Sequence, residues 1–183
     1  PADEKMAIAR YLGHMDRRIR RFINAKRKLI ALLDEQKQAV IHQAVTRGLD
    51  RDVRLKPSGI DWLGDIPEHW DERRLKTLCS MASGLGITSS SIDGEGQYPV
   101  FGGNGVRGYT SEYTHDGSHI LVGRQGALCG NVHLARGRFW ASEHAVVVSL
   151  LAKYDLRWGG ALLRTMNLRQ YSEAAAQPGL SVD

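Results

Sequence analysis

Apolar residues in the first quarter of the chain recur at alternating steps of four and three. This spacing of 3.5 residues is typical of a helix that packs along one seam against a second helix in a coiled coil. The pattern continues to about Ala44 without an interrupting proline, and Gly48 is suited to end the helix. It therefore predicts one helix of about 35 to 40 residues, roughly 55 to 60 Å long. The predicted seam consists of Ile8, Leu12, Met15, Ile19, Phe22, Leu29, Leu33 and Val40.

The predicted helix needs a partner, because so long a helix cannot bury its apolar stripe against itself. A second helix is expected at Leu156–Ala176, but it is shorter and contains Gly159 and Gly160. We therefore expect the seam to be covered by self-association of two copies or by a helix outside this sequence. Lys26 and Gln36 occupy two seam positions, where polar residues usually fix the register or the partner.

A different pattern begins at about residue 50. Residues 50–70 contain Pro57 and Pro67, which interrupt a helix, together with two tryptophans and an isoleucine that are too apolar for a free linker. This segment is expected to be a connector that packs across a domain surface.

Residues 71–183 predict a mixed, strand-rich globular domain. Short apolar runs alternate with clusters of turn-forming residues, among them Gly84–Gly86, Ser89–Gly96 and Gly102–Gly108. The second predicted helix would cover the strands of this domain. The strands are expected around Tyr98–Phe101, His119–Val122, Asn131–Ala135 and Ala145–Leu151.

Composition and charge narrow the class of protein. With 42% hydrophobic and 25% charged residues, the chain has the composition of an ordinary soluble protein, and it lacks an apolar run near the ~18 residues of a membrane span. Cys79 and Cys129 are expected to be buried free thiols, so a reducing compartment, the cytoplasm, is the expected location. The net charge of +5 and a pI near 9.4 favour a polyanionic partner such as nucleic acid.

Two segments resemble a known family. Residues 33–50, LDEQKQAVIHQAVTRGLD, and residues 56–70, KPSGIDWLGDIPEHW, are similar to the central conserved region of the specificity subunits of type I restriction-modification enzymes. The resemblance implies a mixed α/β chain: a coiled-coil spacer helix at 1–49, a connector at 50–70 and a strand-rich globular target recognition domain at 71–183. An intact subunit of this family holds two such domains separated by two antiparallel spacer helices.

The resemblance also implies a function. Such a subunit binds double-stranded DNA without catalysis of its own, and directs a modification (methyltransferase) subunit and a restriction subunit to the target site. S-adenosylmethionine, ATP and Mg are then expected on the partner subunits, with no cofactor in this chain. Two other functions remain open at this point: a piece of a fused restriction-methylation enzyme, and a module whose coiled coil serves assembly alone.

Three pairs of side chains are candidate DNA contacts. Amides and guanidinium groups pair with the edges of adenine and guanine, respectively, and arginines that flank a tight turn are suited to phosphates. Exposed turns carry such residues equally often without a ligand, so a solvated role is the alternative for each pair. The candidates are Asn104 and Arg107 in one glycine-rich turn, Arg124 and Gln125 in a second, and Arg136 and Arg138 around Gly137 in an expected hairpin.

Other motifs have more ordinary interpretations. Gly103, Gly105 and Gly108 fit G-x-G-x-x-G, but a dinucleotide site needs a helix that begins within the motif, so glycines in tight turns are the better interpretation. The histidines lack metal-ligand spacing, so neither a metal site nor a catalytic residue is expected. Glu143 and His144 are expected on opposite faces of a strand, where they cannot act as an acid and base pair.

Overall fold

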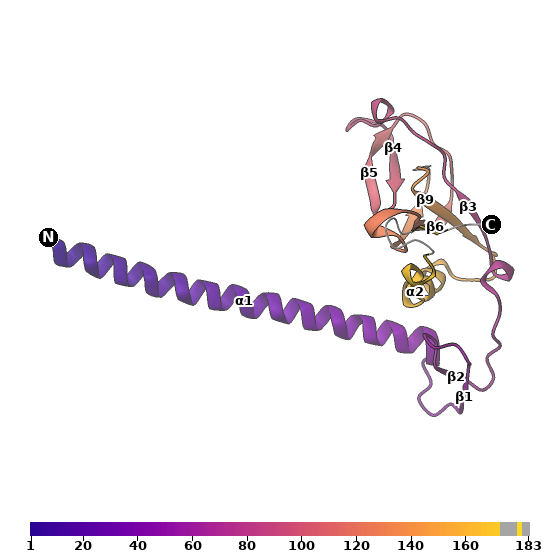
Figure 1. Ribbon diagram of the computed structural model, residues 1–183, viewed down its shortest axis with the longest axis horizontal. Helices are drawn as coiled ribbons and strands as arrows, with labels where there is room; N and C mark the ends of the chain where they lie inside the picture. Colours follow the sequence, from indigo (N-terminus) through magenta and orange to yellow (C-terminus); the bar gives the residue numbers. More distant parts are fainter. Residues whose placement is uncertain (173–178, 181–183) are drawn as a thin grey trace. The chain divides into compact units, whose positions relative to one another are not determined.

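The computed structural model describes residues 1–172, 179 and 180 of the chain (Figure 1). The chain divides into two compact units, Pro1–Ile41 and His42–Asp183. The first unit consists of helix alone, and the second contains the end of that helix and all of the strands.

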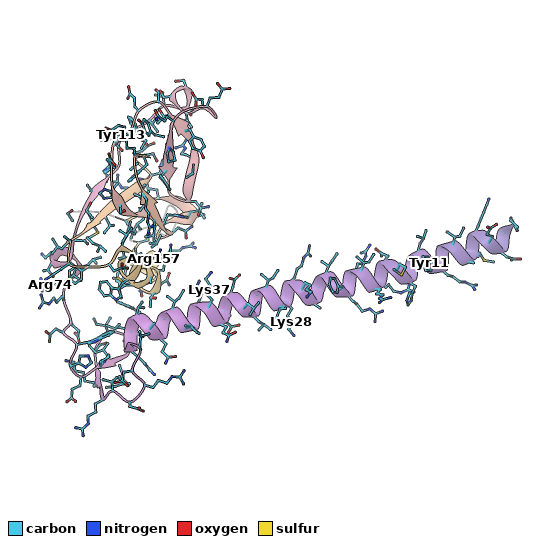
Figure 2. The ribbon with its side chains drawn as sticks, turned by 180° about the vertical axis from the view of Figure 1, so that it is seen from behind. Tyr11, Lys28, Lys37, Arg74, Tyr113 and Arg157 are labelled. Atoms are coloured by element: carbon cyan, nitrogen blue, oxygen red, sulfur yellow. The ribbon has the colours of Figure 1, made fainter. Side chains whose placement is uncertain are left out.

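The long helix predicted from the heptad pattern is confirmed. It is α1, Ala2–Arg47, with 46 residues and a length of about 69 Å, somewhat longer than predicted. Gly48 ends it with a φ of +78°, a left-handed conformation that glycine adopts without steric cost. Figure 2 shows Tyr11, Lys28 and Lys37 along the helix.

The predicted seam lies on the surface of α1. Seven of its eight side chains are exposed, from 47% for Leu29 to 63% for Phe22, and Met15 is half-buried. Exposed apolar residues at this spacing, with no covering element in the described part of the unit, favour a partner helix over a solvated surface. Their role as a coiled-coil seam stays a prediction.

The segment expected to be a connector forms a small antiparallel hairpin. Strand β1, Leu55–Pro57, pairs with β2, Asp65–Pro67. Ile66 and Pro67 are buried, as expected of an apolar segment packed on a surface, and so are Val45 and Thr46 at the end of α1. The two prolines stand at the last position of each strand, where they interrupt only a short ladder.

The globular part contains a four-stranded antiparallel sheet. Its order is β3-β9-β6-β7, with β3 at Cys79–Ser83, β6 at Ser118–Gly123, β7 at Val132–Arg136 and β9 at Ala145–Leu150. The strands predicted near residues 120, 133 and 147 are thus confirmed, whereas the sequence pattern did not predict β3.

A smaller sheet of three strands lies beside it, in the order β5-β4-β8. Strand β4, Tyr98–Gly102, was predicted; β5, Gly105–Thr110, and β8, Trp140–Ala141, were not. The prediction that Gly102–Gly108 is one turn is wrong, because β5 begins at Gly105 and pairs with β4. Four glycines in that stretch lower its strand propensity, so the sequence pattern indicated a turn where the chain forms a strand.

Helix α2, Leu156–Thr165, covers strands β6 and β7. It is shorter than predicted, because Asn167 adopts a left-handed conformation with a φ of 46° and the chain continues as a 3-10 turn, Leu168–Tyr171. The rest of the predicted helix, 173–176, lies outside the described residues. Shorter 3-10 turns occur at Leu75–Thr77, Ser89–Ser91 and Gly126–Leu128.

The two central strands of the larger sheet, β6 and β9, bury both of their faces. Ile120 and Val122 of β6 belong to the core cluster beneath α2, together with Leu163. Leu121 between them packs with Phe139 and Phe101 in a second cluster, on the side of the smaller sheet. Alternation along a strand sends neighbouring side chains to opposite faces, so a continuous apolar run indicates a strand enclosed between two layers.

Helix α2 approaches the sheet closely through its two glycines. A β-carbon at Gly159 would overlap Leu150, and one at Gly160 would lie 2.8 Å from Leu134. The glycines that weakened the helical pattern in the sequence are therefore explained by packing against β7 and β9. In the described part of the chain, no helix combines the length and apolar character of a membrane span.

Candidate functional site

The tip of the β4–β5 hairpin is a two-residue turn, Gly103–Asn104. Asn104 is exposed, and its Oδ1 accepts a hydrogen bond of 2.8 Å from Nδ2 of Asn131, just before β7. Gly105, which follows with a φ of +90°, lies against the imidazole of His133. The turn is therefore held in place by β7, while the amide nitrogen of Asn104 remains free to donate.

Arg107 does not lie in that turn. It is exposed on β5, the outer strand of the smaller sheet, and its side chain runs beside Gly102. The predicted pair of Asn104 and Arg107 thus comes from one hairpin, but from its tip and its edge strand respectively. A base-reading role for either residue stays a prediction.

The second predicted turn, Arg124–Gln125, packs directly against the first. The amide of Arg124 donates 2.9 Å to the carbonyl of His144, and a β-carbon at Gly123 would overlap the carbonyl oxygens of Gly103 and Leu128. Gln125 is exposed and Arg124 is half-buried. Asn104 of the first candidate pair and both residues of the second, about 20 positions apart in the sequence, are therefore brought to one surface.

A third turn adjoins these two. Glu143 and His144 lie in the turn between β8 and β9, and their side chains meet at 3.1 Å, so the expectation that they face opposite sides of a strand is wrong. The carbonyl of His144 lies near Gly103 as well as Arg124. We call the surface formed by Gly103–Asn104, Gly123–Gln125 and Glu143–His144 the three-turn face.

Arg136 and Arg138 lie elsewhere. Arg136 pairs with Ser118 at the start of β6, whereas Arg124 follows Gly123 at the other end of that strand. At 3.3 Å per residue, the two ends of β6 lie about 16 Å apart. The expected hairpin around Gly137 is wrong, because β7 and β8 belong to different sheets and the segment crosses between them.

Arg138 already has partners within the chain. Its Nε donates to Asp116 at 3.0 Å, and its guanidinium lies 4.9 Å from the centre of the Tyr113 ring, labelled in Figure 2. Hydrogen bonding to Asp116 raises the pKa of Arg138, so it stays charged. Arg136 is exposed. A phosphate contact by Arg138 would have to compete with Asp116.

His115 and the two cysteines are packed within the globular domain. His115 stacks on buried Phe139 with ring centres 5.3 Å apart, and burial lowers its pKa. Cys79 and Cys129 are free and buried, as predicted, and burial raises the pKa of both thiols. Within the described residues, no three side chains of His, Cys, Asp or Glu are arranged to hold a metal ion.

Sequence reasoning missed a polar pocket beside the three-turn face. It has a volume of about 330 Å³ and lies between the loop that precedes β7, the end of α2 and the 3-10 turn after it. Its walls include Asn131, His133, Arg164 and Arg169. No motif marks these residues, because they come from separate elements and meet only in the folded chain.

Comparison with known proteins gives the family. The model of the type I restriction modification DNA specificity domain matches residues 67–181. The chain is 58% identical over 129 residues to the type I restriction enzyme EcoprrI specificity subunit of Escherichia coli, an alignment that covers 67% of this chain and 32% of that protein. The chain thus spans about a third of the length of this relative.

Two solved structures share the fold. The S subunit of a type I restriction-modification system from M. genitalium aligns with a TM-score of 0.56 and 19% identity over 73% of this chain and 33% of that one. A chain in a structure of the assembly and conformational transition of the type I R-M system aligns with a TM-score of 0.60 and 16% identity. This alignment covers 100% of this chain and 45% of that one. At these identities the likeness shows the fold alone. Because the family model covers more than half of the sequence, the chain belongs to the type I restriction modification DNA specificity domain family.

Proposed function

We propose that this chain is a DNA-reading part of a type I restriction-modification specificity subunit, made of one spacer helix and one target recognition domain. The globular domain docks on duplex DNA through basic contacts, and its turns read one half of a split target. One observation carries this proposal: in a domain of the specificity family, two turns with base-reading chemistry pack together at Gly103 and Gly123. Polar side chains held on adjoining turns can contact neighbouring base pairs.

In this proposal, methylation and cleavage of the DNA are carried out by other chains. The spacer helix sets the distance between half-sites and recruits the modification subunit, which methylates, while a restriction subunit cleaves. S-adenosylmethionine, ATP and Mg are used by those partners, and this chain contributes recognition without catalysis. Such a complex acts on DNA in the cytoplasm. A chain fused to the modification activity would use the same recognition surface.

A second candidate function is assembly alone. The exposed seam of α1 favours it, because a row of apolar side chains from Ile8 to Val40 requires a partner whatever the globular domain does. The two candidates differ in what the three-turn face does. Only the recognition proposal requires this face to contact base pairs.

Replacing Asn104 tests that contact. In Asn104→Ala, the preference for one base pair of the target should relax by about 1–3 kcal/mol, because the amide that pairs with a base edge is lost. The measurement is a titration against the preferred duplex and against duplexes that vary one base pair at a time. Asn24→Ala on α1 is the control for loss of an exposed amide.

Asn131→Ala distinguishes a base contact by Asn104 from a role of Asn104 in holding the turn. It removes the same hydrogen bond of 2.8 Å but leaves the Asn104 amide in place. Recognition predicts that only Asn104→Ala changes the preference among bases. Equal changes in the two variants would show that Asn104 merely holds the turn, and unchanged affinity in both would favour the assembly module.

A further inference from the structure

The polar pocket beside the three-turn face is built from positive and neutral groups. Arg164, in the last turn of α2, donates from Nε and Nη2 to the carbonyl of Val132, at 3.2 and 3.0 Å. These two bonds fix the guanidinium and leave three of its five N–H groups to donate elsewhere. The wall of the pocket therefore holds a guanidinium whose position is set before any ligand arrives.

Arg169 adds a second positive charge. It lies in the 3-10 turn that begins after Asn167, and Gly130 packs against the backbone of this turn with a φ of +86°. Neither Arg164 nor Arg169 forms an ion pair with another described residue, and none of the lining residues carries a carboxylate. Two arginines that share a pocket without a counter-charge favour an anionic ligand.

His133 completes the wall. Its Nε2 is buried and has no hydrogen-bond partner in the described part of the chain. Burial, and then the charge of Arg164, lower the pKa of His133, so the ring is neutral near pH 7 and the positive charge of the pocket comes from the two arginines. The ring therefore lines the pocket, and its signals report on a group that binds there.

The pocket is joined to the turn that we propose reads bases. Asn131 lines the pocket and donates to Asn104, and His133 lies against Gly105 at the base of the same turn. A group bound in the pocket would therefore stand beside the hairpin tip. Phosphate contacts fix the orientation of a protein on the duplex, so a phosphate bound here would orient the hairpin tip.

We propose that this pocket binds one phosphate group of the DNA backbone and thereby positions the β4–β5 turn against the bases. This inference rests on the proposed function and names one contact within it. The ligand chemistry is that of a phosphate oxyanion, with DNA as its source. Because a phosphate contact carries no sequence information, the pocket contributes affinity and orientation, while the turns contribute the choice of sequence.

Arg169→Gln tests the pocket. We expect affinity to fall about tenfold for preferred and scrambled duplexes alike, and the slope of log K against log salt to decrease by about one. Arg157→Gln is the matched control, since Arg157 is also exposed, stands at the other end of α2 outside the pocket and is labelled in Figure 2. Its slope should change less than that of Arg169→Gln.

The outcomes separate this inference from the proposed function. If the unmodified chain binds a preferred duplex but the two variants have equal affinities and equal slopes, the pocket is not a phosphate site, and recognition still stands. If the unmodified chain binds no duplex under any salt condition, the proposed function fails and this inference fails with it. A change of base preference in Arg169→Gln would also contradict a phosphate contact.

The source of the phosphate is tested by nitrogen NMR of His133. The preferred duplex should shift its ring signals, and a duplex with one neutral methylphosphonate at the contacted position should not. Methylphosphonates at positions outside the contact are the control. A shift with inorganic phosphate and none with the duplex would show a site for the free anion and overturn the assignment to DNA.

Discussion

Substitution of Leu29 and Leu33 by aspartate is expected to abolish self-association of the chain. Both leucines belong to the exposed seam of α1, and a partner helix would bury them. A carboxylate buried between helices without a counter-charge is strongly unfavourable, and each lost leucine contact costs about 2–5 kcal/mol. We expect association at least a hundredfold weaker, measured by sedimentation equilibrium.

Ala31→Asp with Gln38→Asp is the control for the seam. Both residues are exposed and lie on the opposite side of the heptad, so the added charges should leave association unchanged. Circular dichroism checks that all variants keep the helix. A seam variant that associates as strongly as the unmodified chain would contradict a coiled coil between two copies. An unmodified chain that stays monomeric at all concentrations would also contradict self-association and leave a helix outside this sequence as the partner of the seam.

Gly123→Ala is expected to separate the turns of the three-turn face. The added methyl group would overlap the carbonyl oxygens of Gly103 and Leu128, which are backbone atoms that cannot rotate away. Such overpacking costs about 1–3 kcal/mol of folding stability, so the urea midpoint should fall. Because Asn104 and Gln125 would no longer lie on one surface, duplex affinity should fall at least tenfold.

Gly86→Ala is the matched control. Gly86 has open space around its α-carbon and no left-handed φ, so alanine should be tolerated there. Both variants are compared by urea unfolding and by duplex titration at one salt concentration. If Gly123→Ala lost stability but bound duplex like the unmodified chain, the spacing of the two turns would have no role in recognition.

The parts of the fold that depend on local pattern were predictable from sequence. The seam of α1 repeats over ten positions within one helix, and Gly48 ends that helix by its own backbone conformation. The enclosed strands β6 and β9 were predicted because both of their faces are apolar. Local rules are reliable where one element contains the whole pattern.

The parts that depend on contacts between distant segments were not predictable. Strand β5 contains Gly105 and Gly108, and only its pairing with β4 makes it a strand. The guanidinium of Arg138 is suited to a phosphate contact, but it forms an ion pair with Asp116, which lies 22 positions away in the sequence. Likewise, Arg164 and His133 meet only because α2 packs on β7.

In the candidate site, too, residue types were predictable from the sequence, whereas their arrangement was not. Asn104, Arg124 and Gln125 could be selected by residue type and by flanking glycines, and the structure brings them to one surface. The third turn, with Glu143 and His144, was missed because a strand was assumed to run through it. Side-chain chemistry can be inferred from sequence, but which turns share a surface depends on the topology of the two sheets.

The proposed function requires that this chain selects a DNA sequence. The most direct test is a binding selection from randomised duplexes at two salt concentrations, with the chain alone and with a modification subunit of the same family. We expect enrichment of one short motif, one half of a split target, with affinity that falls as salt rises. Binding without enrichment at either salt concentration, or no binding in either form, would contradict it.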